Sequence, residues 1–568
     1  MKSTLPHIIP NIKDWPIYKI SENRSEFIVE LNRYTRKRLF EESKTSTEDL
    51  LDKTIYLEKL RVKNNPWKVD PADDKSYWKE LEKEIETAKN FEDKAERLDK
   101  IVDRIINRYN EEIVGNFKLK TFKFSRNFLH SFFKRLLNPA TFKGQKRIWG
   151  NRDQVKQKIK LHGYVDEMRS LFQKGTVVIV PTHFSNLDSI LIGYALDAVV
   201  GVPASSYGAG LNLLDNEIVA YFINRLGAYR VDRRKKNPIY LECLKSMAAF
   251  SLQKNVNQIF FPGGTRARDG KLEERLKLGL LGSMVEAQRH AIADNHDNKI
   301  YIVPLVLNYH FVLEAKSLID QYLRRTGKEK YTKSREPGAS SGKLMKFIWS
   351  LISKQSDIEL SFGQPMDVFG HQVDKEGNSL DKHGSIIDIS GYFKLEGEVQ
   401  TVYQREKVYT KLLGDKIVDS YRINNVVLSS HLVAFAAFRI LLNKHAELNL
   451  YDVLNIPVAG FEIEKDLFVK VIRKMQSTLK KMEKQGKLRL SEAIALSPEE
   501  LIEDGLKHLG IYHPQKVLKV KKDGSLMSEN FRLLYYYHNR LDSYQLEKSV
   551  KWGDLIKISD PILENSIL

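Results

Sequence analysis

Cysteine is almost absent from this sequence. The 568 residues include a single one, Cys243, so no disulfide can form within the chain, and the cysteine clusters that build zinc sites are missing. The neighbours Leu241 and Leu244 are typical of a helix interior, and we interpret Cys243 as a structural residue. No two-carboxylate metal motif stands out either, so we expect neither a metal nor a bound cofactor.

Long apolar runs are also lacking. The best candidate for a membrane span, residues 426–442, contains two serines, a histidine and an arginine, so we predict a buried helix there. No apolar core of a secretion signal follows Met1. We therefore expect peripheral membrane contact, for which residues 128–137 are a candidate because their aromatic side chains stand beside basic ones. A helix packed on the next domain is the alternative for this segment.

Negative charge is in deficit. The chain has 92 Lys and Arg against 73 Asp and Glu, a net charge of +19, and is 42% hydrophobic. This composition is that of a folded protein with anionic partners rather than of a disordered chain. Nucleic acid, an anionic membrane surface and phosphate-bearing substrates all fit the charge, which alone does not separate them.

Three regions differ in their residue pattern. Residues 1–125 are rich in Lys, Glu and Asp, with apolar residues at heptad-like spacing, which predicts a charged helical accessory region. Residues 126–370 alternate short β-branched runs with helical ones, which predicts an α/β domain. Residues 371–568 begin with a polar linker and continue as amphipathic helices, which predicts a mainly helical C-terminal region. The expected strands lie at 176–180, 257–261, 300–307 and 358–363, and the heptad positions include Ile85, Phe91, Leu98 and Ile101.

A histidine and an aspartate lie five residues apart, where a strand pattern gives way to a helical one. His183 follows the apolar run, and Asp188 opens the helical pattern. With a helix beginning between them, the Asp can reach back to the imidazole, hold Nδ1–H and leave Nε2 as a general base for an alcohol proton. Such a base supplies roughly 10²–10⁴-fold in rate. The alternative is a capping box between Ser185 and Asp188, with His183 as a loop residue.

A run of cations follows Gly227. We interpret Arg234, Lys235 and Lys236 as a solvated charged face, which is the usual role of a charge run. Arg233 is the better candidate for binding a phosphate.

Glycines and arginines are combined in residues 263–268, directly after an expected strand. Glycines allow a backbone to approach an anion closely, and arginines bind phosphate in a bidentate fork. Lys277 opens the next helix, and we expect its cation to join the same site. A plain turn that carries surface arginines is the alternative.

At these places the sequence resembles the glycerolipid acyltransferase family. The order of its blocks is most similar to that of bacterial glycerol-3-phosphate and dihydroxyacetone-phosphate O-acyltransferases. The matching blocks are His183 and Asp188 (His-x-x-x-x-Asp), residues 227–233 (Gly-Ala-x-x-x-x-Arg), residues 261–268 (Phe-Pro-Glu-Gly-Thr-Arg-Ser-Arg), Val303–Pro304 (the final Val-Pro strand) and residues 208–213 (the connection between the first two blocks). The resemblance covers roughly residues 126–370, and four blocks in order are a stronger signal than any one.

The resemblance implies a central, mostly parallel sheet flanked by helices. It implies transfer of a fatty acyl group from acyl-CoA or acyl carrier protein to the hydroxyl of glycerol-3-phosphate in phospholipid biosynthesis. His183 would deprotonate the acceptor, whose oxygen attacks the thioester directly, with no metal and no covalent enzyme intermediate. The expected partners are the acceptor, the acyl carrier and an anionic membrane surface, not nucleic acid, with the protein at the cytoplasmic face of the inner membrane. The expected phosphate ligands are Arg233, Gly264, Thr265, Arg266, Arg268 and Lys277, and Val303 and Pro304 would line an acyl groove.

The sequence departs from the family at Gly263, where the family has Glu, and at Ala267, where it often has Ser or Gly. These departures bear on acceptor recognition more than on the base, because His183 and Asp188 are intact. A lysophosphatidate or other lysophospholipid acyltransferase is the alternative among enzymes. A basic membrane- or nucleic-acid-binding protein is the alternative outside them, although it leaves the His-Asp pair and the Gly-Arg block as coincidences. An α/β hydrolase or a Walker nucleotide site is disfavoured because their signature motifs are missing.

Overall fold

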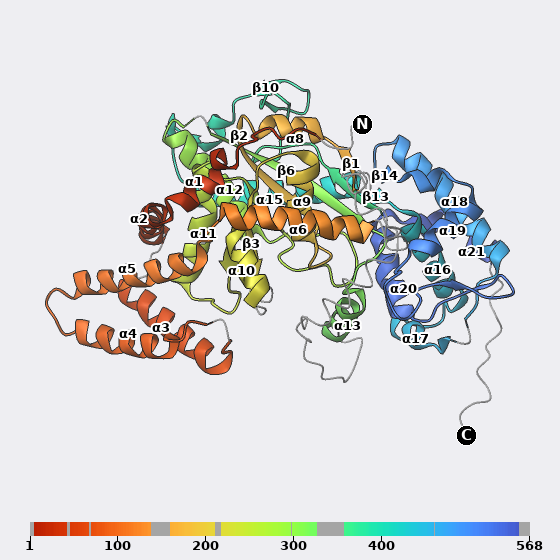
Figure 1. Cartoon of the computed structure of the whole chain (residues 1–568), viewed down its shortest axis with the longest axis horizontal. Helices are drawn as coiled ribbons and strands as arrows, with labels where there is room; N and C mark the ends of the chain where they lie inside the picture. The colour runs from red at the N-terminus through yellow and green to blue at the C-terminus, as the bar shows by residue number, and fades with distance from the viewer. Residues whose placement is uncertain are drawn as a thin grey trace.

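The computed structural model describes residues 5–42, 46–67, 70–137, 159–210, 217–296, 298–326, 357–458 and 461–555. A projecting arm of helices, a central sheet and a set of C-terminal helices follow one another along the molecule (Figure 1). Half of the connection at 208–213 and most side chains of the segment 128–137 lie outside the described residues. Within the described ranges no helix combines the length and the apolar character needed to pass through a bilayer.

The central layer is a seven-stranded sheet in the order β1-β7-β6-β2-β5-β3-β4. All neighbouring strands are parallel except β6 and β7, so the prediction of an α/β domain with a mostly parallel sheet is confirmed. The apolar runs of β2 and β6 are buried along almost their whole length, as expected for parallel strands covered on both faces. The strands are β1 (Ile159–Gly163), β2 (Gly175–Pro181), β3 (Ser206–Gly210), β4 (Ala228–Val231), β5 (Gln258–Ile259), β6 (Lys299–Tyr309) and β7 (Ile358–Phe362).

Helices cover the sheet between these strands. α8 (Val165–Leu171) packs on β2, while α12 (Leu278–Ala293) and α15 (Tyr403–Asn424) pack on β6. The remaining helices of this part are α9 (Asp188–Ala195), α10 (Glu217–Arg225), α11 (Pro238–Gln253) and α13 (Ala315–Arg325).

Strand β3 was not expected from the sequence. Its residues, Ser-Tyr-Gly-Ala-Gly, have little intrinsic preference for a strand, but β5 and β4 flank it and supply hydrogen-bonding partners on both sides. The strand is therefore set by its neighbours in the sheet. The sequence pattern of this segment indicated only a connection.

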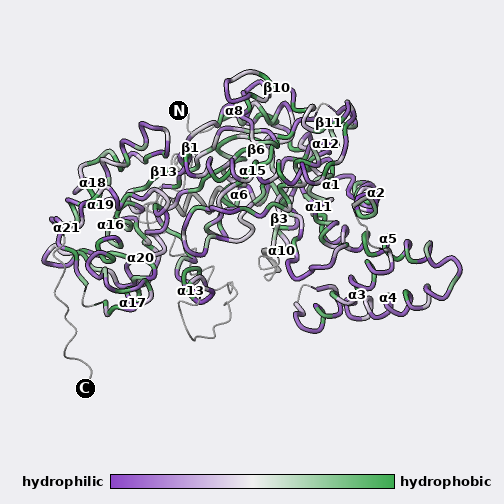
Figure 2. The backbone as a smooth tube through the Cα atoms, turned by 180° about the vertical axis from the view of Figure 1, so that it is seen from behind, coloured by the Kyte–Doolittle hydropathy of each residue, from purple (hydrophilic) through white to green (hydrophobic). Residues whose placement is uncertain are grey.

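The N-terminal part is helical, as predicted. Its helices are α1 (Pro16–Glu22), α2 (Arg24–Glu42), α3 (Thr47–Asn64), α4 (Asp74–Ala88), α5 (Lys94–Ile113) and α6 (Leu119–Leu137), and α3, α4 and α5 form the projecting arm (Figure 1). Ile85, Leu98 and Ile101 are buried in a core that α2–α5 share with α11. Phe91 is instead 45% exposed, and the guanidinium of Arg97 lies 4.0 Å from its ring centroid. The hydropathy tube shows this arrangement as green inner and purple outer turns (Figure 2).

Cys243 belongs to the same core. It is fully buried on α11, and burial raises the pKa of its thiol well above the ordinary value. The thiolate is therefore scarce at neutral pH, which agrees with the interpretation of Cys243 as structural.

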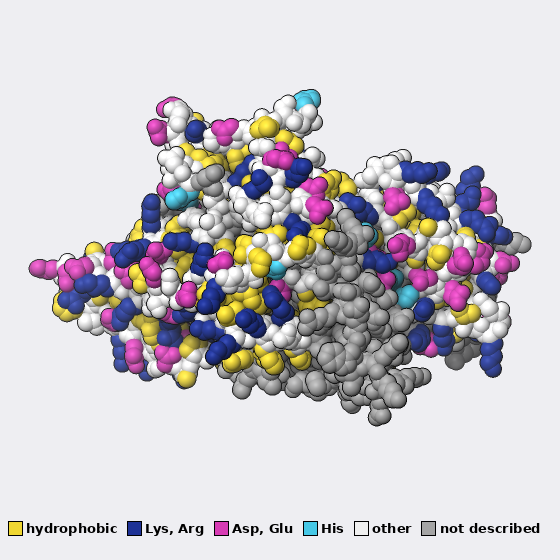
Figure 3. Space-filling model, turned by 45° about the horizontal axis from the view of Figure 1, so that its top comes forward, with side chains coloured by type: hydrophobic (Ala, Val, Ile, Leu, Met, Phe, Trp, Pro, Cys, Tyr) yellow, Lys and Arg dark blue, Asp and Glu magenta, His cyan; other side chains and the backbone are white. Residues whose placement is uncertain are grey.

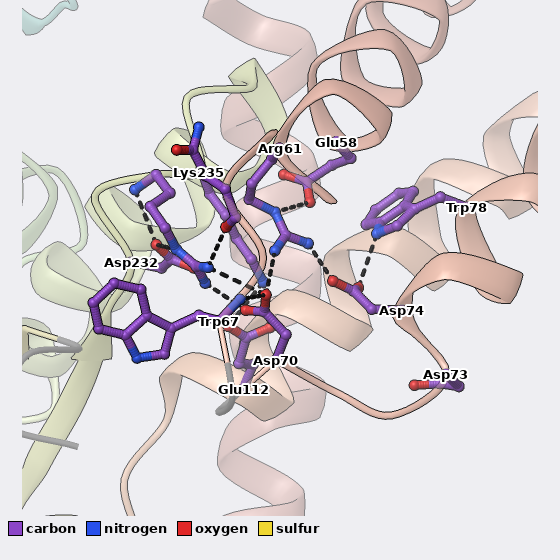
Figure 4. Close-up of polar contacts among 12 residues, drawn as sticks. Glu58, Arg61, Trp67, Asp70, Asp73, Asp74, Trp78, Glu112, Asp232 and Lys235 are labelled. Carbon is purple, nitrogen blue, oxygen red and sulfur yellow. Dashed lines mark hydrogen bonds and ion pairs between the residues drawn. The ribbon is translucent and has the colours of Figure 1, made fainter. Parts of the chain in front are cut away.

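A buried ion network joins the arm to the sheet (Figure 4). Arg61 of α3 is 2% exposed; it donates to Glu58 over 2.8 Å and pairs with Asp74 of α4. Asp70 lies between Arg61 and Arg234. It accepts hydrogen bonds from the guanidinium group of Arg234 and forms an ion pair with Nη1 of Arg61 at 3.2 Å. Charges this deeply buried are tolerated only when paired, so the arm is fixed to the loop after β4 by electrostatics as well as by apolar packing.

This network corrects the interpretation of the cation run as a solvated face. Arg234 bonds both Asp70 and Asp232, and the ammonium of Lys235, 2% exposed, lies 2.6 Å from Glu112 of α5. Only Lys236 of the three is exposed. The pattern of four consecutive cations carried no sign of the carboxylates that the arm brings to them.

The C-terminal part is mainly helical and shares one apolar core with the sheet. The cluster of buried residues runs without a break from β1 to Val550. The segment predicted as a buried helix rather than a membrane span is α16 (Ser429–Lys444), which is buried over most of its length. The other helices here are α17 (Leu450–Asn455), α18 (Lys465–Lys484), α19 (Pro498–His508), α20 (Phe531–His538) and α21 (Trp552–Leu555).

Basic side chains share the drawn face of the molecule with acidic ones (Figure 3). In Figure 3, Lys and Arg (dark blue) lie among Asp and Glu (magenta) over both ends of the described surface. The cations that serve a site must therefore be identified by their local surroundings.

Replacing Arg61 tests the ion network. Arg61→Met leaves Glu58 and Asp74 buried without their cation, so we expect the free energy of unfolding to fall by about 3–5 kcal/mol in urea denaturation. Lys59→Met, on the same helix, breaks only the exposed pair with Glu82 and is expected to change it by about 1 kcal/mol or less. Equal losses for the two variants would contradict the assignment of the network as the anchor of the arm.

Candidate active site

The His-Asp pair lies where β2 ends and α9 begins. β2 ends at Pro181, and the chain crosses the end of the sheet before Asp188 starts α9. β6 runs parallel to β2 and continues beyond Leu305, the partner of Pro181, so Tyr309, its last residue, reaches Asp188. The carboxyl ends of parallel strands are where open α/β sheets form their sites.

The carboxylate of Asp188 gathers four donors. Oδ2 lies 2.9 Å from Nδ1 of His183 and accepts the backbone N–H groups of Phe184 and Ser185 over 2.6 and 2.9 Å. Oδ1 accepts the hydroxyl of Tyr309 over 2.6 Å. Asp188 is fully buried, and these bonds offset the desolvation of its charge. The predicted contact between His183 and Asp188 is thus present in the structure.

The capping alternative is also partly present. Asp188 accepts the N–H of Ser185, which is half of a capping box. The hydroxyl of Ser185 bonds Glu314 instead of the N–H of Asp188, so the box is not closed. The carboxylate of Asp188 therefore both accepts backbone N–H groups of the loop before α9 and orients the imidazole of His183.

His183 presents its second nitrogen to the exterior. Its side chain is 20% exposed, its ring lies against Phe261 with centroids 4.3 Å apart, and no described residue bonds Nε2. With Nδ1 held by a carboxylate, the neutral tautomer with a free Nε2 lone pair is favoured. This is the arrangement of a general base.

The glycine-arginine block begins beside this ring. Gly264 has a φ of +69°, and its N–H bonds the carbonyl of Phe261 in a tight turn. A Cβ on Gly264 would come within 2.5 Å of Cδ and 3.0 Å of Nζ of Lys277. The positive φ disfavours any other residue here, and a side chain would also have to displace the end of Lys277. The predicted proximity of Lys277 to the block is present.

Two arginines approach each other across the site. Partial desolvation of the guanidinium and then the nearby charge of Arg266 lower the pKa of Arg233. The side chain of Arg233 is still reached by solvent, and it bonds no described residue. Arg266 has a partner, Glu314, at 3.2 Å. A cation that faces another cation and lacks an anion of its own is a ready ligand for phosphate.

The remaining predicted residues are placed less decisively. Thr265 and Arg268 are half-buried in the same loop. Val303 and Pro304 are buried in β6, opposite Ile179 and Val180 of β2. Their part in an acyl groove stays a prediction, as do the phosphate-binding roles of the loop residues.

The C-terminal part supplies contacts that the sequence did not reveal. Arg540, fully buried, donates to the carbonyl of Leu307 and to Asn308 at the end of β6, and its guanidinium lies 4.0 Å from the ring centroid of Phe184. Asn539 donates to the carbonyl of Asp269 in the loop after the glycine-arginine block. These residues lie more than 230 positions from their partners, and no local pattern marks them.

Two carboxylates were also missed. Glu314 binds the loop at Ser185 and Asn186, and Glu273 accepts the N–H of His183 over 2.8 Å. Neither belongs to a motif, since their role comes from the loop that they reach. Among the described residues, no group of three or more His, Cys, Asp or Glu is arranged to hold a metal ion.

Comparison with known proteins agrees with this geometry. Residues 154–308, from before β1 to near the end of β6, match the family model described as Acyltransferase. The chain therefore carries an acyltransferase domain. The domain contains the His-Asp pair, the cation run and the glycine-arginine block, and it ends one residue short of Tyr309.

Several bacterial proteins are similar to part of this chain. A glycerol-3-phosphate acyltransferase of Ectopseudomonas mendocina (strain ymp) is 27% identical over 209 residues, 37% of this chain and 23% of the relative. One of Pseudomonas aeruginosa (strain UCBPP-PA14) is 23% identical over 284 residues, 50% of this chain and 30% of the relative. One of Haemophilus ducreyi (strain 35000HP / ATCC 700724) is 30% identical over 167 residues, 29% of this chain and 20% of the relative. The chain thus spans less than a third of the length of each of these relatives.

Removing the carboxylate of Asp188 tests its structural role. Asp188→Ala leaves two backbone N–H groups and the Tyr309 hydroxyl buried without an acceptor, at about 1–3 kcal/mol each. We expect the free energy of unfolding to fall by about 3 kcal/mol or more in urea denaturation. Tyr309→Phe removes one donor and keeps the other three, so a loss of about 1 kcal/mol is expected. A loss for Asp188→Ala no larger than that for Tyr309→Phe would contradict the role of the carboxylate.

Proposed function

We propose that this protein transfers a fatty acyl group from acyl-CoA or acyl carrier protein to a hydroxyl of glycerol-3-phosphate. The observation that carries the proposal is the imidazole of His183, held at Nδ1 by a buried carboxylate and placed beside a glycine-arginine block. The names of the similar bacterial proteins support the choice of acceptor. The net charge of +19 supports contact with an anionic membrane at the cytoplasmic face of the inner membrane.

The proposed reaction needs one base and no covalent enzyme intermediate. Nε2 of His183 takes the proton of the acceptor hydroxyl as the oxygen attacks the thioester carbonyl. Asp188 stabilises the imidazolium that forms, as the carboxylate does in a hydrolase triad. The tetrahedral intermediate collapses, the carbon–sulfur bond breaks, and the imidazolium returns its proton to the thiolate. The products are the ester and the free thiol.

The phosphate of the acceptor would lie between two basic clusters, Arg233 of the cation run and the glycine-arginine block with Lys277. Arg233 brings a charge that no described residue neutralises, and Lys277 brings an ammonium next to the open backbone of Gly264. An anion placed between Arg233 and Arg266 relieves the repulsion of their charges. Binding would thus orient the acceptor by its phosphate and leave its hydroxyls toward His183.

Loss of the base should abolish turnover. We expect His183→Ala to lower the rate of thiol release from palmitoyl-CoA with glycerol-3-phosphate by roughly 10²–10⁴-fold. His162→Ala, a histidine on β1 that bonds Glu359, serves as a control for loss of an imidazole and should retain most of the activity. Turnover with only a lysophospholipid would keep the mechanism and change the acceptor. Absence of turnover with every acceptor and with both carriers would overturn the proposed function.

Loss of Arg233 should act on acceptor binding. Arg233→Met removes one charged hydrogen-bonding group, worth about 1.5–3 kcal/mol, so the KM for glycerol-3-phosphate should rise roughly 10- to 100-fold with the KM for the thioester unchanged. Lys236→Met, an exposed cation of the same run, should leave both constants within about twofold. An equal rise for the two variants would mean that general charge, and not a defined ligand, binds the acceptor.

A further inference from the structure

Glu273 holds the backbone of the base from a position that no motif marks. It lies in the loop between the glycine-arginine block and α12, and its Oε1 accepts the N–H of His183 over 2.8 Å. Its second oxygen, Oε2, is shut off from solvent and bonds no described residue. A carboxylate with one satisfied and one unsatisfied buried oxygen is costly, so its retention beside the base calls for a reason.

The carboxyl of Glu273 fills the space beside Gly263. A Cβ built on Gly263 would come within 3.1 Å of Cγ and 3.3 Å of Oε1 of Glu273. These distances are shorter than ordinary van der Waals contacts, so a larger side chain at residue 263 would displace Glu273. Gly263 departs from the family pattern, and its lack of a side chain leaves room for the carboxylate of Glu273, ten positions downstream.

The charge of Glu273 is poised to change near neutral pH. Burial raises the pKa of its carboxyl to about 7, while the backbone N–H of His183, the guanidinium of Arg540 and the imidazole of His183 act in the opposite direction. The phenol of Tyr421 also faces it: burial raises the pKa of that group well above its ordinary value, and the charge of Glu273 adds to the increase. Asp188 bonds the same histidine at Nδ1 of its imidazole.

We propose that ionised Glu273 is a positioning residue of the acyl-transfer site, which fixes the backbone of His183 and stabilises the imidazolium that forms when the acceptor loses its proton. This inference rests on the proposed function and adds a second carboxylate to the base. The base is then fully active only when His183 is neutral and Glu273 is charged. Acid therefore inactivates the site through two protons, and the acid limb of the pH profile is steeper than one group alone produces.

The test compares charge with shape at one position. Glu273→Gln keeps the size of the side chain and an oxygen for the N–H of His183 but has no charge, whereas Glu273→Asp keeps the charge and loses reach. Glu274→Gln, an exposed neighbour, is the matched control. The measurement is kcat and kcat/KM for thiol release from palmitoyl-CoA with glycerol-3-phosphate, between about pH 5.5 and 8.5, a range that brackets the pKa of about 7 of Glu273.

For Glu273→Gln we expect about a tenfold lower kcat, the factor that corresponds to one pKa unit of lost imidazolium stabilisation, and an acid limb with a slope of one. Glu273→Asp should keep the steep limb of the unmodified protein and exceed Glu273→Gln in kcat at high pH. The control Glu274→Gln should match the unmodified protein in both.

A carboxyl that only fills space gives the opposite ranking. Glutamine would then replace Glu273 better than aspartate does, and all variants would share one acid-limb slope. If the unmodified protein turns over, either result overturns this inference and leaves the proposed function standing. Absence of turnover by the unmodified protein overturns both. Thermal unfolding of each variant identifies any that fails to fold, and the ranking of the remaining carboxylate and amide variants then decides.

Discussion

The buried carboxylate of Asp188 is the interaction on which the site depends. A full negative charge with no solvent access is stable only when its lone pairs are used, and here they accept from an imidazole, two backbone amides and a phenol. Three of these donors come from the loop after β2 and the fourth from the end of β6, so the sheet helps to fix the orientation of His183. The loop does not have to hold the imidazole by itself.

The two flanking parts of the chain hold opposite sides of this site. The arm pairs with Arg234 and Lys235 and so fixes the loop that carries Arg233, while the C-terminal part binds Asp269 and the end of β6 through Asn539 and Arg540. In each contact, the two partners are far apart in the sequence and at least one of them is a buried charged or polar group. Leaving such a group unpaired is costly. The distance between the basic clusters is thus set by parts that lie outside the family blocks.

Much of the fold and the central pair could be predicted from the sequence, because the information is local. Strands β2, β6 and β7 show as apolar or alternating runs, and the contact of His183 with Asp188 follows from a strand-to-helix boundary. Strand β3 could not be predicted, because its small residues adopt the strand through their neighbours. The burial of Lys235 could not be predicted either, because folding alone brings Glu112 to it. Likewise, only folding brings Glu273 to the backbone of His183. The phosphate-binding and groove roles stay predictions.

The unbroken apolar core has a consequence for dissecting the molecule. The segment that matches the family model ends inside β6, and α15, which lies beyond that segment, packs on this strand. The apolar side chains of α16 and α20 belong to the same core. A segment cut at the limits of the sequence match would expose apolar strand faces and unpaired charged groups to water. We expect it to aggregate rather than fold. The limits of the sequence match are therefore not the limits of a piece of chain that folds alone, which is considerably larger.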